Sequence, residues 1–209
     1  MKFKALIAAP IVAWLMIASA ATIERPLDWS SSSSTSPGYQ AGVDSTVVWN
    51  GKPALTLLGT GQTPAAFGDI HQWVGGWGYG GKRVRFSGML RTSAVDLWAG
   101  VYINTGMFSP RAMPSGVGKR GTNAQWQPVS VVIDVPQDVE TIRMGLILVG
   151  NGQAWLSDLK FEEVGSEVPV TTSKVEIDLA HMLREHEYRL QQAKSQPKSM
   201  PANLELRIK

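Results

Sequence analysis

Near the end of its globular part, the chain reads Gly150-Asn151-Gly152-Gln153-Ala154-Trp155-Leu156-Ser157-Asp158-Leu159-Lys160-Phe161. Two glycines around an asparagine are a turn signal, and the apolar residues that follow are spaced for a strand. This order predicts a turn and then the closing strand of a β-domain.

The same pattern extends upstream, where short alternating apolar segments between residues 38 and 168 are separated by Gly, Pro and Asn. This spacing favours an all-β sandwich or barrel over alternating strands and helices. About eight strands in two sheets is the count of a jelly roll. We expect strands at Tyr39–Asp44, Ala54–Leu58, Ile70–Val74, Arg83–Arg91, Trp98–Asn104, Val129–Val135, Ile142–Val149 and Trp155–Glu163.

Alternation also predicts which side of each strand faces the core. In the Arg83–Arg91 strand the core set is Val84, Phe86, Gly88 and Leu90. In the next strand the aliphatic set of Leu97, Ala99, Val101 and Ile103 suits the core. That places Trp98 and Tyr102 on the other face, with Gly100 between them.

The ends of the chain differ in character from the middle. Lys2 and Lys4, an apolar run and Ala18-Ser19-Ala20 form the pattern of a cleavable signal peptide over residues 1–21. Residues 22–37 include a Ser-rich stretch that we interpret as a linker. A jelly-roll domain over residues 38–171 and a C-terminal helix and tail over 172–209 complete the expected organisation.

The C-terminal segment predicts an α-helix from about Lys174 to Lys194. Ser173 and Glu176 have the spacing of a capping box, and apolar residues recur at helical intervals after them. Pro197 and Pro201 end the pattern. The helix is expected either to dock on the sandwich or to bind a partner or a second copy.

Charge and composition narrow the function. The chain carries a net charge of +3, and loss of Lys2 and Lys4 with the signal segment leaves 18 basic against 17 acidic residues. A phosphate-binding surface needs clustered Lys and Arg, so we expect no nucleic-acid partner. The chain contains no Cys. Export to a bacterial periplasm or cell exterior is the expected localisation, with the membrane contacted only through the signal segment.

Several segments together resemble a bacterial jelly-roll domain with a carbohydrate-binding-module-like, galactose-binding-like fold. They are Tyr39–Asp44, Gly81–Gly88, Trp98–Gly100, Val131–Pro136, Gly145–Gly150, Trp155–Leu159 and the closing Val168–Thr171. Proteins with such a domain are often labelled transcriptional regulators. This chain shows no recognisable DNA-binding helix pair, so that label does not follow from its residues.

The chain departs from the resembling family at four places. Tyr102 stands where the family usually has a second Trp, and Asn104 where it has an Arg. The residues from Met107 to Met113 lack an expected Asp-Asn-Met pattern, and Ser157-Asp158 replaces an Asp pair. We therefore do not expect a polar or metal contact that depends on those acids.

Aromatic faces bind sugar rings by stacking, while flanking polar groups meet the hydroxyls. The candidate ligand-binding residues are therefore aromatic and polar side chains on or near the predicted strands. The alternative is that these aromatics cover the sandwich ends and that the polar residues form a solvated strand face. Trp126 and Trp155 are expected to pack in the core or at a sheet edge. The candidates are Trp98, Tyr102, Asn104, Gln72, Trp73, Trp77, Tyr79 and Arg85.

Catalytic and metal sites are not expected. The chain has no Cys nucleophile and no Gly-x-Ser-x-Gly elbow, and its acids show no diagnostic spacing. Asp69 and His71 share one strand face, but two ligands alone do not form a metal site. We expect no metal, no cofactor and no enzymatic activity.

The sequence therefore predicts an exported, non-catalytic binding module for a glycan or another small envelope ligand, acting by aromatic stacking. The alternative is a structural or interaction protein that uses the sandwich as a scaffold and the C-terminal helix for a partner or self-association. The loop expected at residues 105–125 is the segment most able to cover or frame the ligand face.

Overall fold

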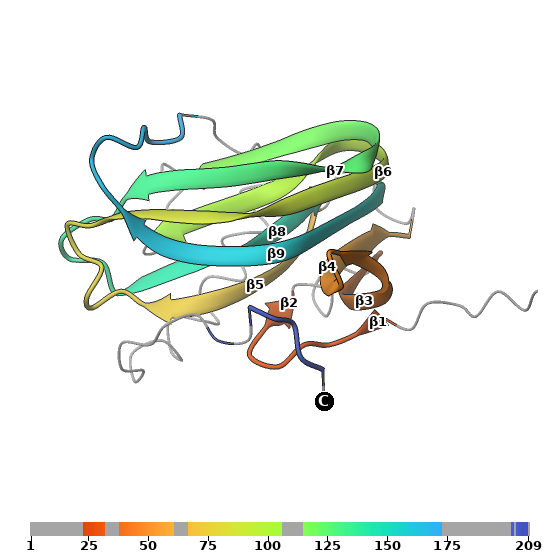
Figure 1. Cartoon of the computed structure of the whole chain (residues 1–209), viewed down its shortest axis with the longest axis horizontal. Helices are drawn as coiled ribbons and strands as arrows, with labels where there is room; N and C mark the ends of the chain where they lie inside the picture. The colour runs from red at the N-terminus through yellow and green to blue at the C-terminus, as the bar shows by residue number, and fades with distance from the viewer. Residues whose placement is uncertain are drawn as a thin grey trace, which may run out of the picture.

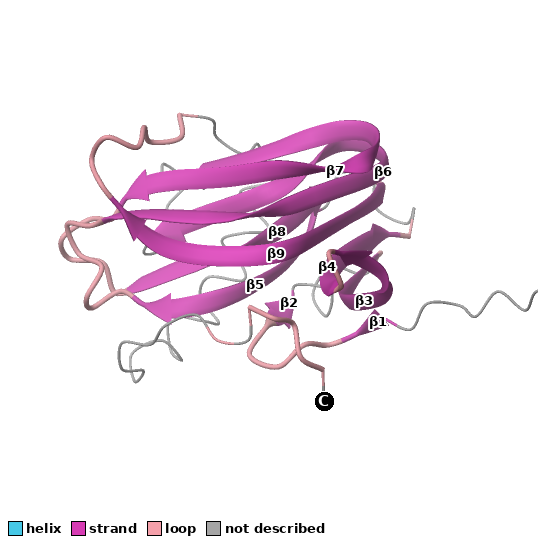
Figure 2. Cartoon of the chain, in the orientation of Figure 1, coloured by secondary structure: helices cyan, strands magenta, loops and turns pink. Residues whose placement is uncertain are grey.

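The computed structural model describes residues 23–31, 38–60, 67–105, 115–172, 202 and 204–208. In this part the chain is all-β, and Figure 2 shows strands and loops without a helix. The strands are β1 (Ile23–Glu24), β2 (Ser30–Ser31), β3 (Tyr39–Trp49), β4 (Lys52–Gly59), β5 (Phe67–Gly75), β6 (Arg83–Thr105), β7 (Ser115–Asp134), β8 (Thr141–Val149) and β9 (Gly152–Val164).

The described strands form one antiparallel sheet in the order β1-β3-β4-β9-β6-β8-β5-β2, with β7 paired to β6. Figure 1 shows β6 and β7 running together across the molecule while β3 and β4 curl at one end. The first half of β6 pairs with β9 from Arg83 to Ser93, and the second half pairs with β8 from Trp98 to Thr105. A single strand thus belongs to both halves of a curled sheet.

The curl lies between the two halves of β6, where its register with β7 shifts three times between Leu90 and Ala99. Ala94 has a positive φ of 51° in this stretch. Bulges of this kind bend a strand and increase its twist. The sequence predicted two strands here, Arg83–Arg91 and Trp98–Asn104, and the structure joins them into β6.

The main core fills the space between the two halves of the curled sheet. Val84, Phe86 and Leu90 line it from one half, and Val101, Ile103 and Leu146 from the other. The predicted core set Val84, Phe86, Gly88 and Leu90 is buried as expected. Leu97 is the exception in the second set because its side chain is 38% exposed at the bend.

Two turns explain how the sequence closes this sheet. Asn50 and Gly51 both have positive φ, at 48° and 77°, which suits a tight hairpin between β3 and β4. Gly150 and Gly152 also have positive φ, so the turn predicted from the opening stretch is confirmed. Asp158 has φ 53° at a register shift opposite Ser87 and Met89, and this bulge keeps both Leu156 and Leu159 in the core.

Three expectations change at the edges of the domain. Residues 115–125, expected as part of a long loop, belong to β7 because this segment pairs with residues 92–103 of β6. Ser30 and Ser31, expected within a linker, pair with Ile70 and His71 of β5. Trp29 beside them is 2% exposed and belongs to the main core.

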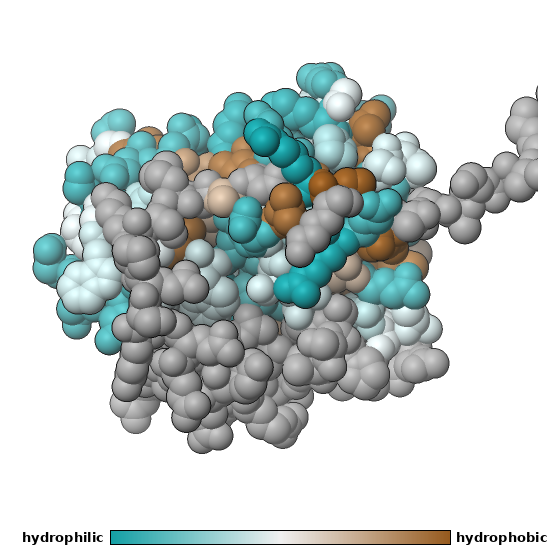
Figure 3. All heavy atoms as spheres, turned by 90° about the horizontal axis from the view of Figure 1, so that it is seen from below, coloured by the Kyte–Doolittle hydropathy of each residue, from teal (hydrophilic) through white to brown (hydrophobic). Residues whose placement is uncertain are grey.

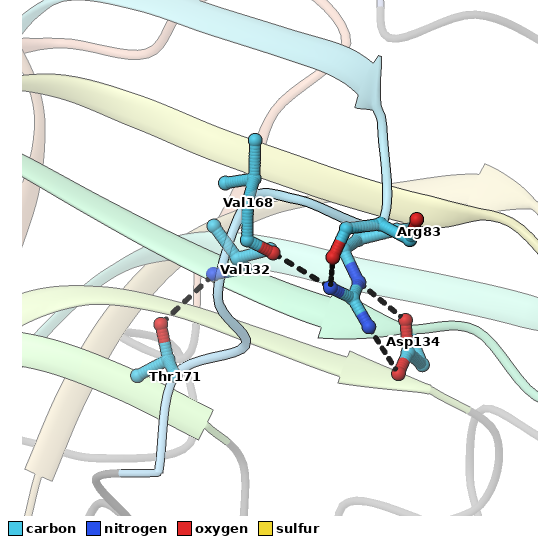
Figure 4. A network of polar contacts seen from close by, with 6 residues as sticks. Arg83, Val132, Asp134, Val168 and Thr171 are labelled. Carbon is cyan, nitrogen blue, oxygen red and sulfur yellow. Dashed lines mark hydrogen bonds and ion pairs between the residues drawn. The ribbon is translucent and has the colours of Figure 1, made fainter.

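The segment after β9 returns to the sheet and forms hydrogen bonds with it (Figure 4). Arg83 donates two hydrogen bonds to Asp134, of 2.7 and 2.9 Å, and Nη1 donates to the carbonyl oxygens of Ser166 and Val168, both at 2.7 Å. Thr171 and Val132 exchange backbone and side-chain hydrogen bonds of 2.8 and 3.0 Å. Residues 165–171 therefore belong to the domain and cover an edge of β7.

The last described residues also pack onto the sandwich, near β1 and β2 (Figure 1). Ile208 forms a β-bridge with Pro26, and Leu206 is 3% exposed within the main core. Gln72 exchanges two hydrogen bonds with the backbone of Ala202. The predicted signal peptide and the predicted helix at 174–194 lie outside the described residues.

Candidate functional site

The candidate site is the face of β5, β8 and the second half of β6 that points away from the main core; we call it the aromatic face. Strand register places His71, Gly145 and Tyr102 in one row across it. The next row holds Trp73, Arg143 and Asn104, and another holds Phe67, Val149 and Trp98. Phe67, Tyr102 and Ile147 form a second hydrophobic cluster here, with Trp73, Trp98 and Val149 packed against it.

The Trp98 ring packs over the neighbouring strand β7. A Cβ placed on Gly118 would lie 2.5 Å from Cζ2 and 2.6 Å from Cε2 of the Trp98 ring. Only a glycine leaves room for the indole at this position. One side of the ring is thus fixed on the sheet, and the side chain as a whole is half-buried.

A polar cluster occupies the middle of the aromatic face. The Tyr102 hydroxyl donates a 2.5 Å hydrogen bond to Oδ2 of Asp69, and Nη2 of Arg143 forms an ion pair with the same oxygen. Nδ1 of His71 lies 2.9 Å from this oxygen and 3.2 Å from Nη2 of Arg143, and its tautomer decides which contact is a hydrogen bond. All four side chains are buried.

Several groups of this cluster act on the pKa of Asp69. Burial alone would raise the pKa of Asp69, but the positive charges of Arg143 and His71 and hydrogen bonds from His71 and Tyr102 outweigh burial and hold that pKa well below its usual range. Arg143 also lies over two rings, 5.4 Å from the Trp73 centroid and 5.8 Å from that of Tyr102. The cluster therefore keeps Asp69 ionised and orients both aromatic rings.

Asn104 supplies a further polar group beside Arg143. Its Nδ2 is buried and makes no hydrogen bond to any residue that the structure describes. Buried amides normally have a partner, and an unsatisfied buried donor is the kind of group that a water molecule or ligand completes. Asn104 thus offers a hydrogen-bond donor in the same row as the half-buried Trp73, with Arg143 between them.

The structure brings together four of the eight residues predicted from the sequence: Trp98, Tyr102, Asn104 and Trp73. Alternation explains this result, because Trp98, Tyr102 and Asn104 are at even positions of one strand and Trp73 faces Arg143 in the same layer. Tyr102 is 2% exposed, so it supports the face rather than presenting a free ring.

The other four predicted residues lie elsewhere. Gln72 points to the opposite side of β5, where it binds Ala202. Tyr79 is 2% exposed in the core and packs edge-on against Phe161 with ring centroids 5.4 Å apart. Trp77 is 72% exposed in the connector after β5. Arg85 is on the first half of β6 and pairs with Glu162 at 2.8 Å.

Sequence reasoning missed Asp69, His71 and Arg143 as members of this site. Asp69 and His71 were considered only as metal ligands, and the described residues hold no group of three or more side chains suited to a metal ion. Arg143 had a usable signal, because it interrupts the otherwise apolar strand Ile142–Val149. A charged residue in a buried strand needs a partner of opposite charge, so Arg143 predicts an acid on a neighbouring strand.

On the side shown in Figure 3, the described hydrophobic atoms form small separate patches among hydrophilic ones. Within the part of the chain that the structure describes, there is no helix with the length and apolar character to cross a bilayer.

Comparison with known proteins gives a curated relative and many similar folds. The chain matches no protein-family profile. It is 30% identical over 138 residues to an uncharacterised HTH-type transcriptional regulator, YbfP, of Bacillus subtilis (strain 168). The match covers 64% of this chain and 46% of that relative, so the chain spans less than half of the regulator's length.

Solved structures confirm an all-β fold like that of carbohydrate-binding modules, although the described strands form one curled sheet and not the two sheets that were expected. The C-terminal family 22 carbohydrate-binding module of Clostridium thermocellum Xyn10B superposes with a TM-score of 0.51 at 10% identity, over 71% of this chain and 96% of that module. The N-terminal modules of the same xylanase, determined with xylohexaose, give a TM-score of 0.50 at 12% identity, over 73% of this chain and 29% of that one. The predicted resemblance to carbohydrate-binding modules, and to proteins labelled transcriptional regulators, is confirmed.

Proposed function

We propose that this protein is a non-catalytic glycan-binding module of jelly-roll fold and that the aromatic face is its binding surface. The observation that supports it most is the position of Trp98, which is half-buried, packs over Gly118 and lies on the same face as a buried polar cluster. A flat indole is the surface on which the C–H groups of a sugar ring stack. The likeness of the fold to family 22 modules agrees with this proposal.

Each part of the face has a defined task in this mechanism. The register separates Trp98 from Trp73 by six residues along the strands, so the two indoles contact different sugar rings of one oligosaccharide. The Asn104 amide, in the same row as Trp73, donates to a hydroxyl of the ring there. Asp69, His71, Tyr102 and Arg143 act as positioning residues, because they fix the strands and the rings beneath the ligand. Binding is reversible and involves no bond making or breaking, so no acid–base pair is needed.

The place of action follows from the sequence pattern at the N-terminus. We propose that residues 1–21 direct export and that the domain then binds a polysaccharide of the cell envelope or surroundings. The chain spans less than half of the Bacillus subtilis relative, and the proposal does not rest on the label of that relative.

A glycan array tests the proposal. The protein and its Trp98→Ala variant are applied to an array of plant and bacterial polysaccharides that includes xylan and xylohexaose. We expect binding by the wild type to at least one glycan and loss of that signal in the variant, with unchanged far-UV circular dichroism. Binding to no glycan, or equal binding by both folded proteins, would refute it.

A further inference from the structure

A second aromatic surface lies on the other half of the curled sheet, again on the side away from the main core. Trp155 of β9 faces Arg91 of β6 in the register, and the Arg91 guanidinium carbon lies 5.3 Å from the centroid of the Trp155 ring. On the other side of Arg91, the β6–β7 register shifts opposite residues 124–126. We call Trp49, Arg91, Trp126 and Trp155 the tryptophan–arginine surface.

The end of β3 completes this surface. Trp49 is the last residue of β3, and its ring centroid is 6.1 Å from that of Trp126 with the planes tilted by 56°. Both rings and Arg91 are half-buried, so each retains exposed area. Segments from β3, β6, β7 and β9 thus bring three indoles and one guanidinium together.

Trp155 is held in a fixed orientation. Its indole nitrogen donates a 3.0 Å hydrogen bond to Oδ2 of the buried Asp44. Asp44 in turn accepts hydrogen bonds on Oδ1 from the backbone and hydroxyl of Thr46, at 3.0 and 2.6 Å. Burial would raise the pKa of Asp44, but these hydrogen bonds outweigh it and lower that pKa. The ring under Arg91 is therefore preorganised.

Arg91 itself retains its hydrogen-bonding capacity. Among the described residues, its guanidinium makes no hydrogen bond or ion pair and lies over the Trp155 ring. By contrast, Arg83 and Arg85 on the same side of β6 are both paired with carboxylates. A cation–π contact uses none of the N–H groups of the guanidinium, so they remain available to another partner.

We propose that the tryptophan–arginine surface is a second binding site, specific for an acidic sugar. A guanidinium offers paired N–H donors that match a carboxylate or sulfate, and the neighbouring indoles supply stacking faces for the ring that carries it. The shared chemistry is an anionic group on a sugar. This site is independent of the aromatic face, since it uses the first half of β6 and the aromatic face uses the second.

Isothermal titration calorimetry with three oligosaccharides of equal length tests the site. The probes are trigalacturonic acid, a sulfated galactotriose and neutral galactotriose. We expect the full-length protein to bind at least one anionic probe and to bind the neutral one at least about tenfold more weakly. Comparison of the two anionic probes shows whether the site takes a carboxylate or a sulfate.

Matched variants locate the binding. We expect Arg91→Gln and Trp126→Ala each to lower the affinity for the anionic probe at least about tenfold. Arg85→Gln is the matched control, because it removes the same charge from the same strand face and should leave that affinity unchanged. Trp98→Ala is also expected to leave the affinity for the anionic probe unchanged. A defect in the aromatic face and a defect in this second site therefore change the binding of different probes. No binding of either anionic probe, equal binding of the neutral probe, or equal effects of Arg91→Gln and Arg85→Gln would overturn the proposal.

Discussion

The Tyr102 hydroxyl donates a 2.5 Å hydrogen bond to Oδ2 of Asp69, although β8 lies between the strands that carry them. The bond passes over β8 because Gly145, which faces both Tyr102 and His71, has no side chain. This hydrogen bond joins three strands of the aromatic face and supports the rings that lie on it.

Removal of this hydroxyl should destabilise the fold. We expect Tyr102→Phe to lower the free energy of unfolding by about 1–3 kcal/mol, because a buried, charged acceptor loses a donor. Urea unfolding followed by tryptophan fluorescence measures the change. Tyr39→Phe is the comparison, since the Tyr39 hydroxyl donates to the neutral carbonyl oxygen of Gly150 at 2.9 Å and its loss should cost less. Equal losses in the two variants would contradict a special contribution from Asp69.

Asp69 should also give the fold a distinct pH dependence. A carboxyl whose pKa is lower in the folded than in the unfolded chain stabilises the fold above the unfolded value of about 3.9. That contribution declines as the pH falls toward the folded pKa, which lies well below the usual range.

We therefore expect Asp69→Asn to reduce stability by about 3–5 kcal/mol at neutral pH, because Arg143 loses its buried partner. The difference in the free energy of unfolding between the wild type and this variant should shrink by about 1.4 kcal/mol for each pH unit below about 3.9. In that range the wild type loses the stabilisation from ionised Asp69, whereas the variant has no carboxyl at this position to lose it from. Urea unfolding at a series of pH values checks this expectation. A difference that stays constant below pH 3.9 would show that Asp69 is not held ionised.

The glycine beneath Trp98 should matter for binding as well as for stability. In Gly118→Ala, the new methyl group would overlap the Trp98 ring and the Ala99 carbonyl oxygen, so we expect a lower melting temperature and weaker glycan binding. Gly121→Ala is the control, because that position has open space but a positive φ of 72°. It should lower the melting temperature by strain alone and leave glycan affinity intact. Unchanged affinity in Gly118→Ala would mean that the position of Trp98 is irrelevant to the ligand.

The C-terminal residues should contribute to the core. Leu206→Ala is expected to cost about 2–4 kcal/mol in thermal or urea unfolding, because Leu206 is a buried member of the main core. Glu205→Ala, at an exposed neighbouring position paired only with Arg207 among the described residues, should change stability by less than about 1 kcal/mol. A small effect of Leu206→Ala would show that residues 204–208 are not part of the folded unit.

Alternation and turn signals were sufficient to predict most of the longer strands and the side of β6 that carries Trp98 and Tyr102. They could not predict the bend inside β6, because a register shift depends on which strand pairs with each half. For the same reason residues 115–125 resembled a loop, since their Gly and Asn content conceals a strand that is fixed by pairing with residues 92–103.

The candidate site was predictable only where one strand carries several of its members. Trp98, Tyr102 and Asn104 share β6, so period-two spacing brings them to one face. Asp69 and Arg143 are 74 residues apart and meet only after β5 pairs with β8. Trp155 was expected to be packing, and its buried ring fits that expectation, but its partner Asp44 is 111 residues away and no local pattern connects them.

The most direct test of the account is the affinity of Trp98→Ala for the strongest glycan on the array, measured by calorimetry beside Trp77→Ala. Both variants remove one indole, but Trp77 is 72% exposed in a connector and outside the aromatic face. We predict a loss of at least about tenfold for Trp98→Ala, the value of one lost stacking contact, and no loss for Trp77→Ala. Equal affinities for the wild type and both folded variants would contradict the assignment of the aromatic face as the glycan-binding surface.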